Sequence, residues 1–492
     1  MKRFAIILAV AASPSMALAG GFEFLGNGAE VVGRGGAFTA KADDLTAVEN
    51  NVAGLARQRG TRLQLEGALR FGDYTFQRSG VYPDAVTAET PYGGQPYPKV
   101  SNSAPPFFGP MGGLSTDFGY FDRWTFGLAV YGPSSYGKRA YGTLTSAGAP
   151  LTNGTPSPQR YDVVSTDLFL FYPTLAAAVR VTKWLELGAA FHLVVGIFNL
   201  SNVSLVDLGR SLCPTTESAT CDSTTNISTT GVTASFSFGA MFHPLPALSI
   251  GLHLKGNADV DSTGTIKATA PPAMPIMLAP GQATFHAHLP WVLRLGVRYA
   301  FMKDGFERGD VEVDGTYEAW AAAEGTGDSL DVRNLSFFKD FTTSIEHHFQ
   351  DTFSVRVGGA YNFHVPWGVM TLRLGFYYDS SATRNQDTRI DFDTMEKYAP
   401  TAGLAYRTHG ITFNLGYAYL YSPDRTVTNG TVRIIQGTDG SHDSATNGPD
   451  GKPAPLPVVN NGVYHASTQV LTFGATILWD ELLKKKRVVA YE

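Results

Sequence analysis

The chain has 492 residues, of which 43% are hydrophobic and 16% are charged, and its formal net charge is −5. A nucleic-acid binder would carry excess positive charge and a disordered acidic tail would be poor in hydrophobic residues, so the composition excludes both classes. The 6 Trp, 22 Tyr and 31 Phe, together with 53 Gly, favour a chain of many strands and tight turns over a helical one.

The first 19 residues predict a secretory signal peptide. A basic pair, Lys2 and Arg3, precedes an apolar run over 4–12, and the segment ends in the small residues of 17–19. This order is typical of export signals, and we expect cleavage before Gly20. A short membrane anchor is the alternative, but the apolar run is shorter than the roughly 18 residues that a spanning helix needs.

Beyond this segment, no uninterrupted apolar stretch is long enough to cross a bilayer as a helix. The best candidate, 187–198, is broken by His192 and two glycines. Helices and closed barrels are the only structures that satisfy every backbone amide in lipid, so a membrane location for this chain would require a barrel.

From residue 61 onward, apolar residues recur with a period of two, which places them on one face of a strand. The segment 61–71 illustrates the pattern. One face carries Leu63, Leu65, Leu69 and Phe71, and the other carries Arg62, Gln64, Glu66 and Arg70. The same alternation recurs in 249–259, 291–301, 353–363 and 411–421.

Counting strands by this pattern and by breakers predicts about fourteen of them. They lie near 61–77, 111–121, 123–133, 165–182, 185–202, 229–242, 248–269, 288–302, 307–322, 340–363, 368–380, 396–408, 410–422 and 465–479. Short connections, such as 122–123 and 183–184, alternate with long ones, such as 134–164 and 203–228. Brief periplasmic turns and long extracellular loops alternate in this way in transmembrane barrels.

The sequence therefore predicts an all-β fold, a transmembrane antiparallel β-barrel of about fourteen strands over 61–479, in the outer membrane of a Gram-negative bacterium. Both chain ends would lie on the periplasmic side. A secreted β-sandwich is the alternative, but a sandwich does not need every second connection to be long. Residues 480–492 follow the aromatic Trp479 and contain four consecutive basic residues, and we expect them to form a solvated periplasmic tail.

Residues 20–60 do not alternate and are rich in glycine and small side chains. A barrel of about fourteen strands has an interior too wide for its own side chains to fill, so this segment can plug the lumen. Glycine-rich, nearly uncharged backbone suits close packing against a wall. We therefore expect 20–60 to form a plug, or hatch, inside the barrel, with the periplasm as its alternative location.

Several ordered motifs run along the chain. They are Gly21-Phe22, Gly33-Arg34-Gly35-Gly36-Ala37, Ala42-Asp43-Asp44, Asn50-Asn51-Val52-Ala53-Gly54-Leu55, Phe126-Gly127-Leu128, Gly132-Pro133, Leu289-Pro290, Tyr317-Glu318-Ala319-Trp320 and Gly403-Leu404-Ala405-Tyr406-Arg407. In this order they resemble the FadL/TodX (OmpP1) family of outer-membrane transporters for hydrophobic compounds. The resemblance covers essentially the whole mature chain, and the ordered set is more specific than any single motif.

The resemblance implies a fourteen-stranded barrel closed by an N-terminal hatch. It also implies that a hydrophobic ligand, such as a long-chain fatty acid or an aromatic hydrocarbon, is captured outside, passed to an inner pocket and released sideways at a kinked third strand. Gly132-Pro133 is compatible with a kink, because proline removes a ladder donor, although the pair can equally end the strand. In the hatch, the family's Asn-Pro-Ala-Gly reads Asn51-Val52-Ala53-Gly54 here, which removes the proline that would stiffen this turn.

The segment 271–280 reads PPAMPIMLAP and lies in a connection that the topology places outside the cell. An extracellular loop should be polar, so apolar side chains in it should either pack against other residues or take part in binding. These side chains are Met274, Ile276, Met277 and Leu278. Because methionine adapts to ligands of varied shape, we expect this patch to make the first contact with an oily substrate, with packing against neighbouring loops as the alternative.

An inner ligand site would lie near the start of the mature chain. Phe22, Phe24 and Leu25 are candidates for contact with an acyl or aromatic tail, and Arg34, Arg62 or Arg70 for pairing with a carboxylate. Each of these arginines can instead be one half of an ion pair within the wall. Whether the ligand is acidic stays open at this point.

The two cysteines, Cys213 and Cys221, lie in a polar stretch where a disulfide would close a short loop in an oxidising compartment. A zinc site is less favoured, because no histidine or third cysteine lies nearby to complete it. We therefore expect a disulfide here and neither a metal nor a cofactor in the protein.

No catalytic motif is recognisable. His347-His348 and Asp43-Asp44 lack any surrounding motif, no phosphate-binding glycine loop opens a helix, and HExxH is absent. We expect a channel and not an enzyme, with a general diffusion porin for small polar solutes as the second channel hypothesis. The expected partners are a hydrophobic small molecule, outer-membrane lipid and lipopolysaccharide. We expect no nucleic-acid partner and a monomeric chain.

Overall fold

The computed structural model describes residues 25–483, apart from 89, 133–137, 146–148, 207, 209–210, 214, 325–327, 337–339, 346, 393, 436–442 and 448–452. The predicted signal peptide, the aromatic pair Phe22 and Phe24, Pro133 and most of the expected tail lie outside the described residues.

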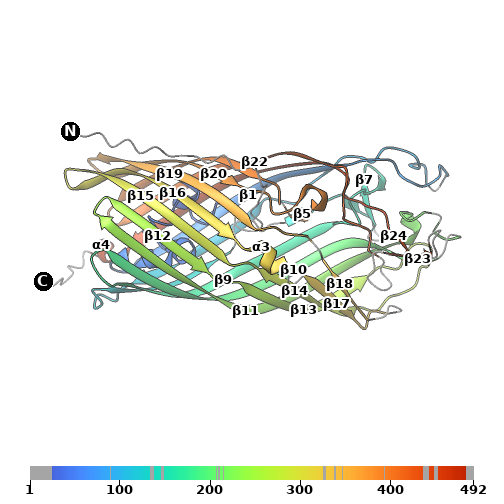
Figure 1. Cartoon of the computed structure of the whole chain (residues 1–492), viewed down its shortest axis with the longest axis horizontal. Helices are drawn as coiled ribbons and strands as arrows, with labels where there is room; N and C mark the ends of the chain where they lie inside the picture. The colour runs from blue at the N-terminus through green and yellow to red at the C-terminus, as the bar shows by residue number, and fades with distance from the viewer. Residues whose placement is uncertain are drawn as a thin grey trace.

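Twenty strands pair antiparallel into one closed sheet that has fourteen positions around its wall (Figure 1). In wall order the positions are β1 (Arg62–Arg78), β3 (Phe107–Thr116), β4 (Trp124–Tyr131), β9 (Ser165–Arg180), β10 (Leu185–Leu205), β11 (Asp222–Leu245), β12 (Leu248–Lys255) with β13 (Ala258–Ala268), β15 (Val292–Lys303) with β14 (Gly281–Leu289), β16 (Phe306–Glu318) with β17 (Ser329–Arg333), β19 (Thr352–Val365) with β18 (Phe341–Ser344), β20 (Gly368–Asp379), β21 (Lys397–Thr408), β22 (Ile411–Val427) and β25 (Gly462–Leu478). The short strands β2 (Val100–Ser101) and β5 (Lys138–Ala140) extend the second and third positions.

The ring closes between its first and last strands. β1 pairs with β25 along its whole length, from Arg62 opposite Leu478 to Arg78 opposite Gly462. The predicted fold class is thus confirmed, and each expected strand corresponds to one position of the wall.

The strand ends differ from the prediction where alternation fails. β11 begins at Asp222, before the expected start at 229, because its first outward residues, Asn226 and Ser228, are polar and give no apolar signal. The expected strand 307–322 ends at Glu318, since helix α3 (Trp320–Glu324) follows directly. Strands that continue beyond the apolar band are therefore longer than hydropathy alone indicates.

The two faces of each strand separate as the alternation predicts, and β15 shows this clearly. Its large apolar residues from 293 to 301 point outward, and Leu295 and Phe301 are 51% and 49% exposed. Arg294 and Arg298, of the opposite parity, are 1% and 6% exposed in the interior. The outward face is therefore the oily one, as in a barrel that meets lipid and unlike a sandwich that buries its apolar faces.

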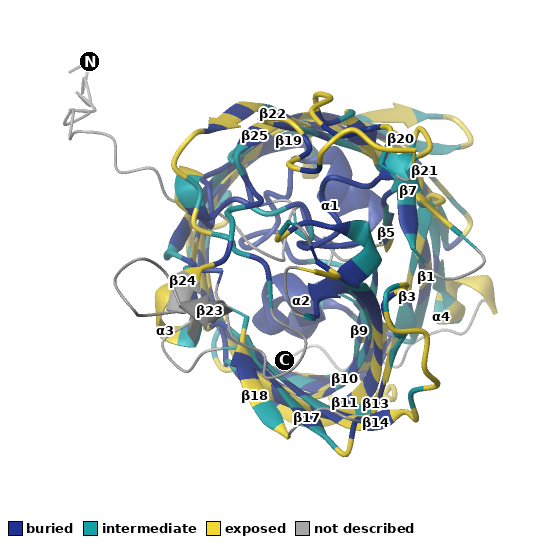
Figure 2. Cartoon of the chain, turned by 90° about the vertical axis from the view of Figure 1, so that its right-hand side faces the viewer, coloured by how far each residue is buried: buried dark blue, intermediate teal, exposed yellow. Residues whose placement is uncertain are grey.

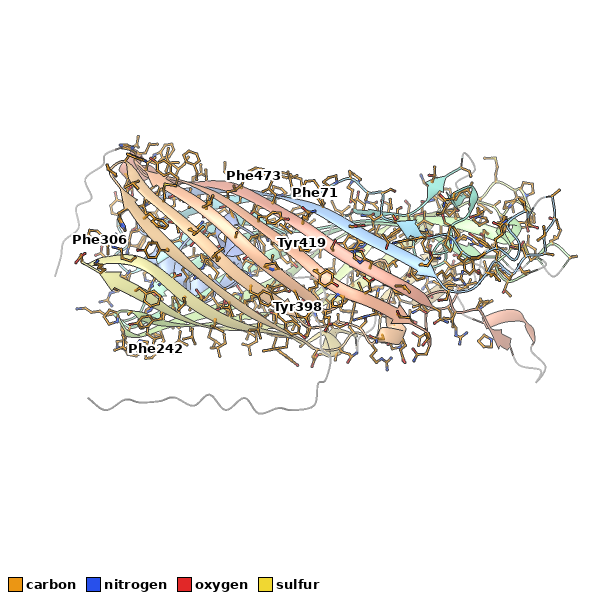
Figure 3. All side chains as sticks on the ribbon, turned by 90° about the horizontal axis from the view of Figure 1, so that it is seen from above. Phe71, Phe242, Phe306, Tyr398, Tyr419 and Phe473 are labelled. Carbon is orange, nitrogen blue, oxygen red and sulfur yellow. A yellow bond between two sulfur atoms is a disulfide. The ribbon has the colours of Figure 1, made fainter. Side chains whose placement is uncertain are left out.

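Aromatic side chains are spread over the outside of the barrel. Those labelled in Figure 3 are Phe71, Phe242, Phe306, Tyr398, Tyr419 and Phe473. Trp124, Trp184 and Trp367 are exposed close to the short turns, and amphipathic rings of this kind suit the level where lipid meets water. Among the described residues, no helix is both long and apolar enough to cross a membrane.

Residues 25–60 lie inside the ring, where Figure 2 shows α1 and α2 surrounded by the wall. The segment contains α1 (Ala29–Gly33), α2 (Ala47–Asn50) and the 3-10 helix η1 (Val52–Arg57). Every residue from 45 to 56 is buried, and the largest apolar cluster joins this segment to the wall. We call residues 25–60 the hatch.

The two ends of the barrel differ in the length of their connections. The short turns and α4 (Trp479–Leu482) lie at one end, which we call the short-turn end. The other, long-loop end carries β6 (Thr143–Leu144), β7 (Pro150–Thr152), β8 (Thr155–Pro156), η2 (Ala219–Cys221), η3 (Asn385–Asp387), β23 (Asp443–Asn447) and β24 (Pro453–Pro455) (Figure 1).

Candidate functional site

A row of three carboxylates on β16 ties the hatch to the wall. Asp310, Glu312 and Asp314 occupy alternate positions, so all three side chains point into the lumen. Arg34 of the hatch contacts Asp310 at 2.6 Å and Glu312 at 3.2 Å, and all three side chains are fully buried. On β15, Arg298 pairs with Asp310 as well, at 2.7 Å. Arg34 therefore belongs to an ion-pair network that joins the hatch to the wall.

The same row accepts hydrogen bonds from the hatch backbone. The amides of Phe38 and Thr39 donate to Asp314 Oδ2 at 2.9 and 2.8 Å, and the amide of Ala40 donates to Glu312 Oε1 at 2.6 Å. Buried amides outside regular secondary structure need such acceptors. The row therefore supplies the hydrogen-bond partners of a hatch turn that no strand pairs with.

Glycines in the wall let the hatch lie directly against the barrel backbone. A Cβ atom at Gly358 would stand 2.1 Å from the carbonyl oxygen of Arg34, and one at Gly375 would stand 2.2 Å from the carbonyl carbon of Arg34. Equivalent close approaches to the hatch occur at Gly188, Gly239, Gly251, Gly296, Gly403 and Gly416, which lie on six further strands. We call these eight residues the glycine belt, and it fixes the seat of the hatch by shape.

The turn that lacks the family proline is held by hydrogen bonds. Asn51 Nδ2 donates to the carbonyl of Thr39 at 2.8 Å and to that of Ala240 at 3.1 Å, and Asn51 Oδ1 accepts from the amide of Ala53 at 3.2 Å. Val52 and Ala53 begin η1 and are fully buried. At Gly54, a Cβ atom would stand 2.0 Å from the carbonyl oxygen of Ala42, so only glycine fits there.

The remaining candidates for the inner ligand site lie in or beside the hatch. Leu25 is buried in a cluster with Val32, Tyr377 and Leu420. Arg62 is half-buried and donates to the carbonyl of Asp43 at 3.3 Å. Arg70 is buried, and its guanidinium lies 5.8 Å from the centre of the Phe107 ring. The structure thus distributes these residues between hatch packing and wall contacts.

Among the described residues, which leave out 133–137, the wall is incompletely paired at its third position. β4 ends at Tyr131, and β5 resumes at Lys138. In the described part of the chain, β3 residues 107–111 pair with β1 alone, and β9 residues 168–171 pair with β10 alone. We call this place the wall gap.

Two contacts mark the wall gap. The rings of Phe107 on β3 and Phe169 on β9 make an edge contact across it, with centroids 6.3 Å apart. From the hatch, Asn27 Nδ2 donates to the carbonyl of Gly132 at 2.5 Å. The start of the hatch is therefore in direct contact with Gly132, the residue that follows β4.

A cavity of about 430 Å³ lies within the long-loop half of the barrel. Its apolar lining comes from the inward faces of seven strands and from neighbouring loops. Prominent apolar lining residues are Leu168, Phe198, Ile227, Ile266, Phe285 and Leu330. The volume and the apolar walls are those of small-molecule sites. On β9, Leu168 belongs both to the cavity lining and to the edge of the wall gap, so the two features adjoin.

One side of the cavity carries a compact polar group, which we call the polar end. Arg389 Nη2 lies 2.8 Å from Asp162 Oδ1, and Arg389 Nε lies 3.4 Å from Asp391 Oδ2. His347 Nε2 lies 2.9 Å from the same Asp391 oxygen, and its ring stacks on Phe349 at 4.8 Å between centroids.

The electrostatics of the polar end follow from these contacts. Burial alone would raise the pKa of the Asp391 carboxyl, but Arg389 and His347 outweigh it and lower that pKa to about 2. Burial opposes the charged form of His347, yet Asp391 raises the pKa of this imidazole above its usual value of 6.5. The polar end thus holds carboxylates and cations that stabilise each other.

The apolar segment 271–280 forms part of the long-loop surface. Met277 is 95% exposed, Met274 and Ile276 are exposed, and Leu278 is half-buried. The segment is held by the amide of Ala273, which donates to the carbonyl of Thr220 at 2.8 Å. In the chain it follows Ala268, which lines the cavity, so the patch begins close to the cavity lining.

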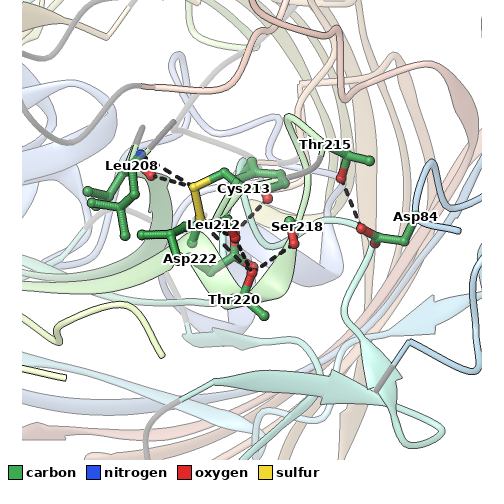
Figure 4. Close-up of a disulfide and its surroundings, with 11 residues drawn as sticks. Asp84, Leu208, Leu212, Cys213, Thr215, Ser218, Thr220 and Asp222 are labelled. Carbon is green, nitrogen blue, oxygen red and sulfur yellow. Dashed lines mark hydrogen bonds between the residues drawn. A yellow bond between two sulfur atoms is a disulfide. The ribbon is translucent and has the colours of Figure 1, made fainter. Parts of the chain in front are cut away.

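Cys213 and Cys221 are joined by a disulfide in the loop before β11 (Figure 4). Thr215, inside the closed loop, donates to Asp84 Oδ1 at 2.9 Å and so links it to the loop after β1. Both sulfur-bearing residues pack in an apolar cluster at the long-loop end. In the described part of the chain, no group of three His, Cys, Asp or Glu side chains is arranged to hold a metal ion.

Sequence reasoning did not single out the cavity residues. None of the predicted ligand contacts that the structure describes lines the cavity. A signal was present, because 168–172 and 193–198 are apolar on both faces of their strands, whereas lipid-facing strands elsewhere alternate. Apolar side chains at the strand positions that point into the lumen identify a surface that an apolar ligand can contact.

The fold and its contents define a class of protein: a membrane β-barrel plugged by its own N-terminal segment, with an apolar cavity in the rest of the lumen. Over residues 9–447 the sequence matches the family described as outer membrane protein transport protein (OMPP1/FadL/TodX), and the chain belongs to this family. The resemblance seen in the motifs is thereby confirmed, and the protein is an outer-membrane barrel. Outer-membrane barrels have short periplasmic turns and long extracellular loops, so we assign the short-turn end to the periplasm and the long-loop end to the cell exterior.

Solved structures share the fold at low sequence identity. A Pseudomonas aeruginosa FadL homologue is 16% identical, with a TM-score of 0.70 over 93% of this chain and 99% of that chain. The P. putida toluene transporter TodX is 16% identical, with a TM-score of 0.65 over 92% and 99% of the two chains. The Ralstonia pickettii toluene transporter TbuX is 16% identical, with a TM-score of 0.61 over 92% and 99%.

No curated protein gave a sequence match. The family comprises transport proteins, which agrees with the expectation that the chain is a channel and not an enzyme.

Proposed function

We propose that this chain is a passive channel for hydrophobic small molecules, such as long-chain fatty acids or aromatic hydrocarbons, and that the extracellular cavity is its ligand chamber. The observation that carries the proposal is the apolar lining of a lumen that is plugged below. On the inward face of β11, Gly239 touches the hatch while Ile227, farther toward the extracellular end, lines the cavity. A diffusion porin needs an open polar lumen, and the buried hatch is unsuited to one.

Capture would begin at the exposed segment 271–280. Met277 and Ile276 present apolar surface to water, and methionine adapts to guests of different shape. Because the segment follows a strand whose last inward residues, Ile266 and Ala268, line the cavity, a captured molecule has a short apolar way inward.

Release would occur sideways through the wall gap. Three features support this route. Within the described residues, β9 residues 168–171 pair with β10 alone, Leu168 lines the cavity, and Phe107 and Phe169 form an apolar pair across the gap. The hatch contact from Asn27 to Gly132 suggests a means of coupling gap opening to movement of the hatch start. The transported molecule would then enter the outer-membrane lipid and lipopolysaccharide that surround the monomeric barrel.

The variant Ala287→Phe tests the chamber. Ala287 is buried and lines the cavity, so a phenyl ring there would take space that the ligand needs. We expect accumulation of radiolabelled oleate or toluene at limiting concentration to fall by about tenfold. A cavity that already holds the phenyl ring cannot take up the ligand as well without strain.

The matched control is Ala234→Phe, which places the same side chain on the exposed outer face of β11. It should transport as the wild type does. Equal uptake by both variants, at equal amounts of barrel in the membrane, would remove the cavity from the transport route.

A photoreactive substrate analogue distinguishes the release routes. After irradiation of intact outer membranes, sideways release predicts adducts at Phe107 and Phe169, which border the wall gap. Adducts at buried hatch residues such as Leu45 and Val48, with none at the gap, would instead indicate passage through the hatch.

A further inference from the structure

We infer that the outer surface of the barrel carries a binding site for lipid A, the phosphorylated disaccharide that anchors lipopolysaccharide in the outer leaflet. The site is a polar groove on the wall, separate from the ligand cavity. The inference goes beyond the proposed function, because it gives the expected lipopolysaccharide partner a defined place on the barrel.

A groove of about 470 Å³ runs across the outside of the adjacent strands β5, β9, β10, β11 and β13. We call it the rim groove. Its residues share the parity of Leu175 and Val232, which are 61% and 57% exposed, so their side chains point away from the lumen. One row of register partners in the groove is Lys138, Asp167, Asn199, Ser228 and Thr265. The next row, toward the long loops, ends in Asn226 and Lys267.

The rim groove lies where the apolar outer surface of these strands ends. On the periplasmic side of the groove, the outward residues are Phe169 and Phe171 on β9 and Val195 and Ile197 on β10. Apolar side chains on the outside of a barrel mark the hydrocarbon layer, so the polar rows beyond them meet the head groups of the outer leaflet. Phe169 also borders the wall gap, so the acyl chains of a lipid in the groove would lie beside that gap.

The outward charges of the rim groove favour an anion. Lys267 is exposed and has no ion pair among the described residues. Lys138 lies 2.7 Å from Asp167, but the two side chains are 46% and 40% exposed, and an exposed pair contributes little. Lys138 can therefore exchange this partner for a phosphate. Two lysines face outward here against one carboxylate.

Other strands carry the opposite charge at the corresponding place. Beyond the outward Phe71 and Tyr421, β1 and β22 present the exposed carboxylates of Asp73 and Asp424. Clusters of one sign attract the opposite charge and repel their own. An anionic head group is thus favoured at the rim groove and disfavoured along β1 and β22.

The spacing of the two lysines fits a head group with two separated phosphates. Their strands lie four inter-strand steps of about 4.8 Å apart, which places the backbones about 19 Å from each other. Between them lie uncharged donors and acceptors, among them Asn199, whose Oδ1 accepts from Ser228 Oγ at 2.7 Å. Such side chains suit the hydroxyl and amide groups of a sugar. A disaccharide with a phosphate at each end can meet both lysines, whereas a glycerophospholipid offers a single phosphate.

Native mass spectrometry tests the site on the full-length protein, delipidated in detergent. The protein is titrated with bis-phosphorylated lipid A, with the same lipid after removal of both phosphates, and with phosphatidylglycerol. We expect lipid A to bind at least about tenfold more tightly than either of the others, because only lipid A makes two charge-assisted contacts beside the sugar contacts. An excess of inorganic phosphate should not displace it, since free phosphate gains nothing from the groove floor or from the apolar strip.

Two variants locate the binding. Lys138→Gln and Lys267→Gln each remove one contact, so each should weaken lipid A binding by about threefold, and the double variant by about tenfold, because distant sites add. Both side chains are exposed, so the barrel should fold as in the wild type. Lys303→Gln, at an exposed lysine beside a periplasmic turn, removes the same charge elsewhere and should leave the affinity unchanged.

The inference is overturned if phosphatidylglycerol or the dephosphorylated lipid binds as tightly as lipid A. It is also overturned if the double variant binds lipid A as the wild type does, or if Lys303→Gln weakens binding equally. None of these outcomes affects the proposed channel. Conversely, normal transport by Ala287→Phe would remove the ligand chamber and leave the rim groove as it is.

Discussion

The periplasmic and extracellular halves of the lumen belong to the same closed wall but differ in chemistry. In the periplasmic half, the inward groups that meet the hatch include carboxylates, such as Asp310 and Asp314, and glycines, such as Gly375, beside apolar side chains. In the extracellular half, the inward groups around the cavity are mainly apolar, such as Ile227 and Phe285.

The difference teaches what each guest requires. A polypeptide plug brings amides that leave water, so its wall must offer acceptors at fixed positions and leave room for backbone. A hydrophobic molecule brings no such groups, and apolar walls bind it without fixing it. One half of the lumen is therefore suited to hold its contents and the other to exchange them.

The sharpest way to break this contrast is Arg34→Met. The change keeps the volume but leaves Asp310 and Glu312 without their hatch partner in a fully buried site. Removing one member of a buried ion pair costs about 3–5 kcal/mol. We expect the hatch to loosen, so that single-channel conductance in planar bilayers rises and the hatch becomes accessible to protease, while the barrel strands stay protected.

Arg333→Met is the matched control. This arginine is 41% exposed and lies 3.5 Å from Asp331, and an exposed pair contributes little. The variant should keep the low conductance of the wild type. A closed, protease-resistant hatch in Arg34→Met would show that the carboxylate row does not retain it.

A smaller effect is expected from Gly375→Ala, which tests the glycine belt. The added methyl group would stand 2.2 Å from the carbonyl carbon of Arg34 and 2.3 Å from the amide nitrogen of Gly35. Both are backbone atoms, which cannot move without distorting the hatch. Overpacking of this kind costs about 1–3 kcal/mol. Hydrogen exchange of the hatch amides should accelerate accordingly.

Gly315→Ala is the control for the belt. Its added methyl group would point outward, 3.7 Å from Phe353 Cε2, which is an ordinary contact. Alanine costs less backbone entropy than glycine, so this variant should be at least as stable as the wild type. Equal exchange rates in both variants would argue that the hatch is not seated on the belt.

The smallest effect should come from Met277→Asp, which changes the extracellular half alone. Losing roughly 1 kcal/mol of apolar contact at first capture lowers uptake at limiting substrate by about fivefold, and saturating substrate should restore it. Conductance should not change, because the hatch is untouched. Met302→Asp, at a methionine that is 54% exposed near the periplasmic turns, should transport normally.

Much of the barrel was predictable because its pattern is local. Alternation needs only neighbouring residues, so Leu295 and Arg298 could be assigned to opposite faces from the sequence alone, and both assignments are confirmed. Where the outward face turns polar, as at Asn226 of β11, the pattern fades and the strand start was placed too late.

The contents of the lumen were less predictable because they depend on distant residues. Arg34 meets Asp310, which is 276 positions away in the chain, and no local pattern links the two. The polar end joins Asp162, His347 and Asp391 from three separate loops. Only closure of the ring brings such residues together, so the sequence could name Arg34 as notable but not its partner.

The disulfide between Cys213 and Cys221 has a consequence for biogenesis. The bond lies at the extracellular end, but the oxidising machinery of such bacteria works in the periplasm. We therefore expect the bond to form before membrane insertion, so that this loop passes to the cell surface as a covalently closed ring and not as an extended thread. The cysteines are separated by 8 positions, so the closed loop that has to cross the membrane is small.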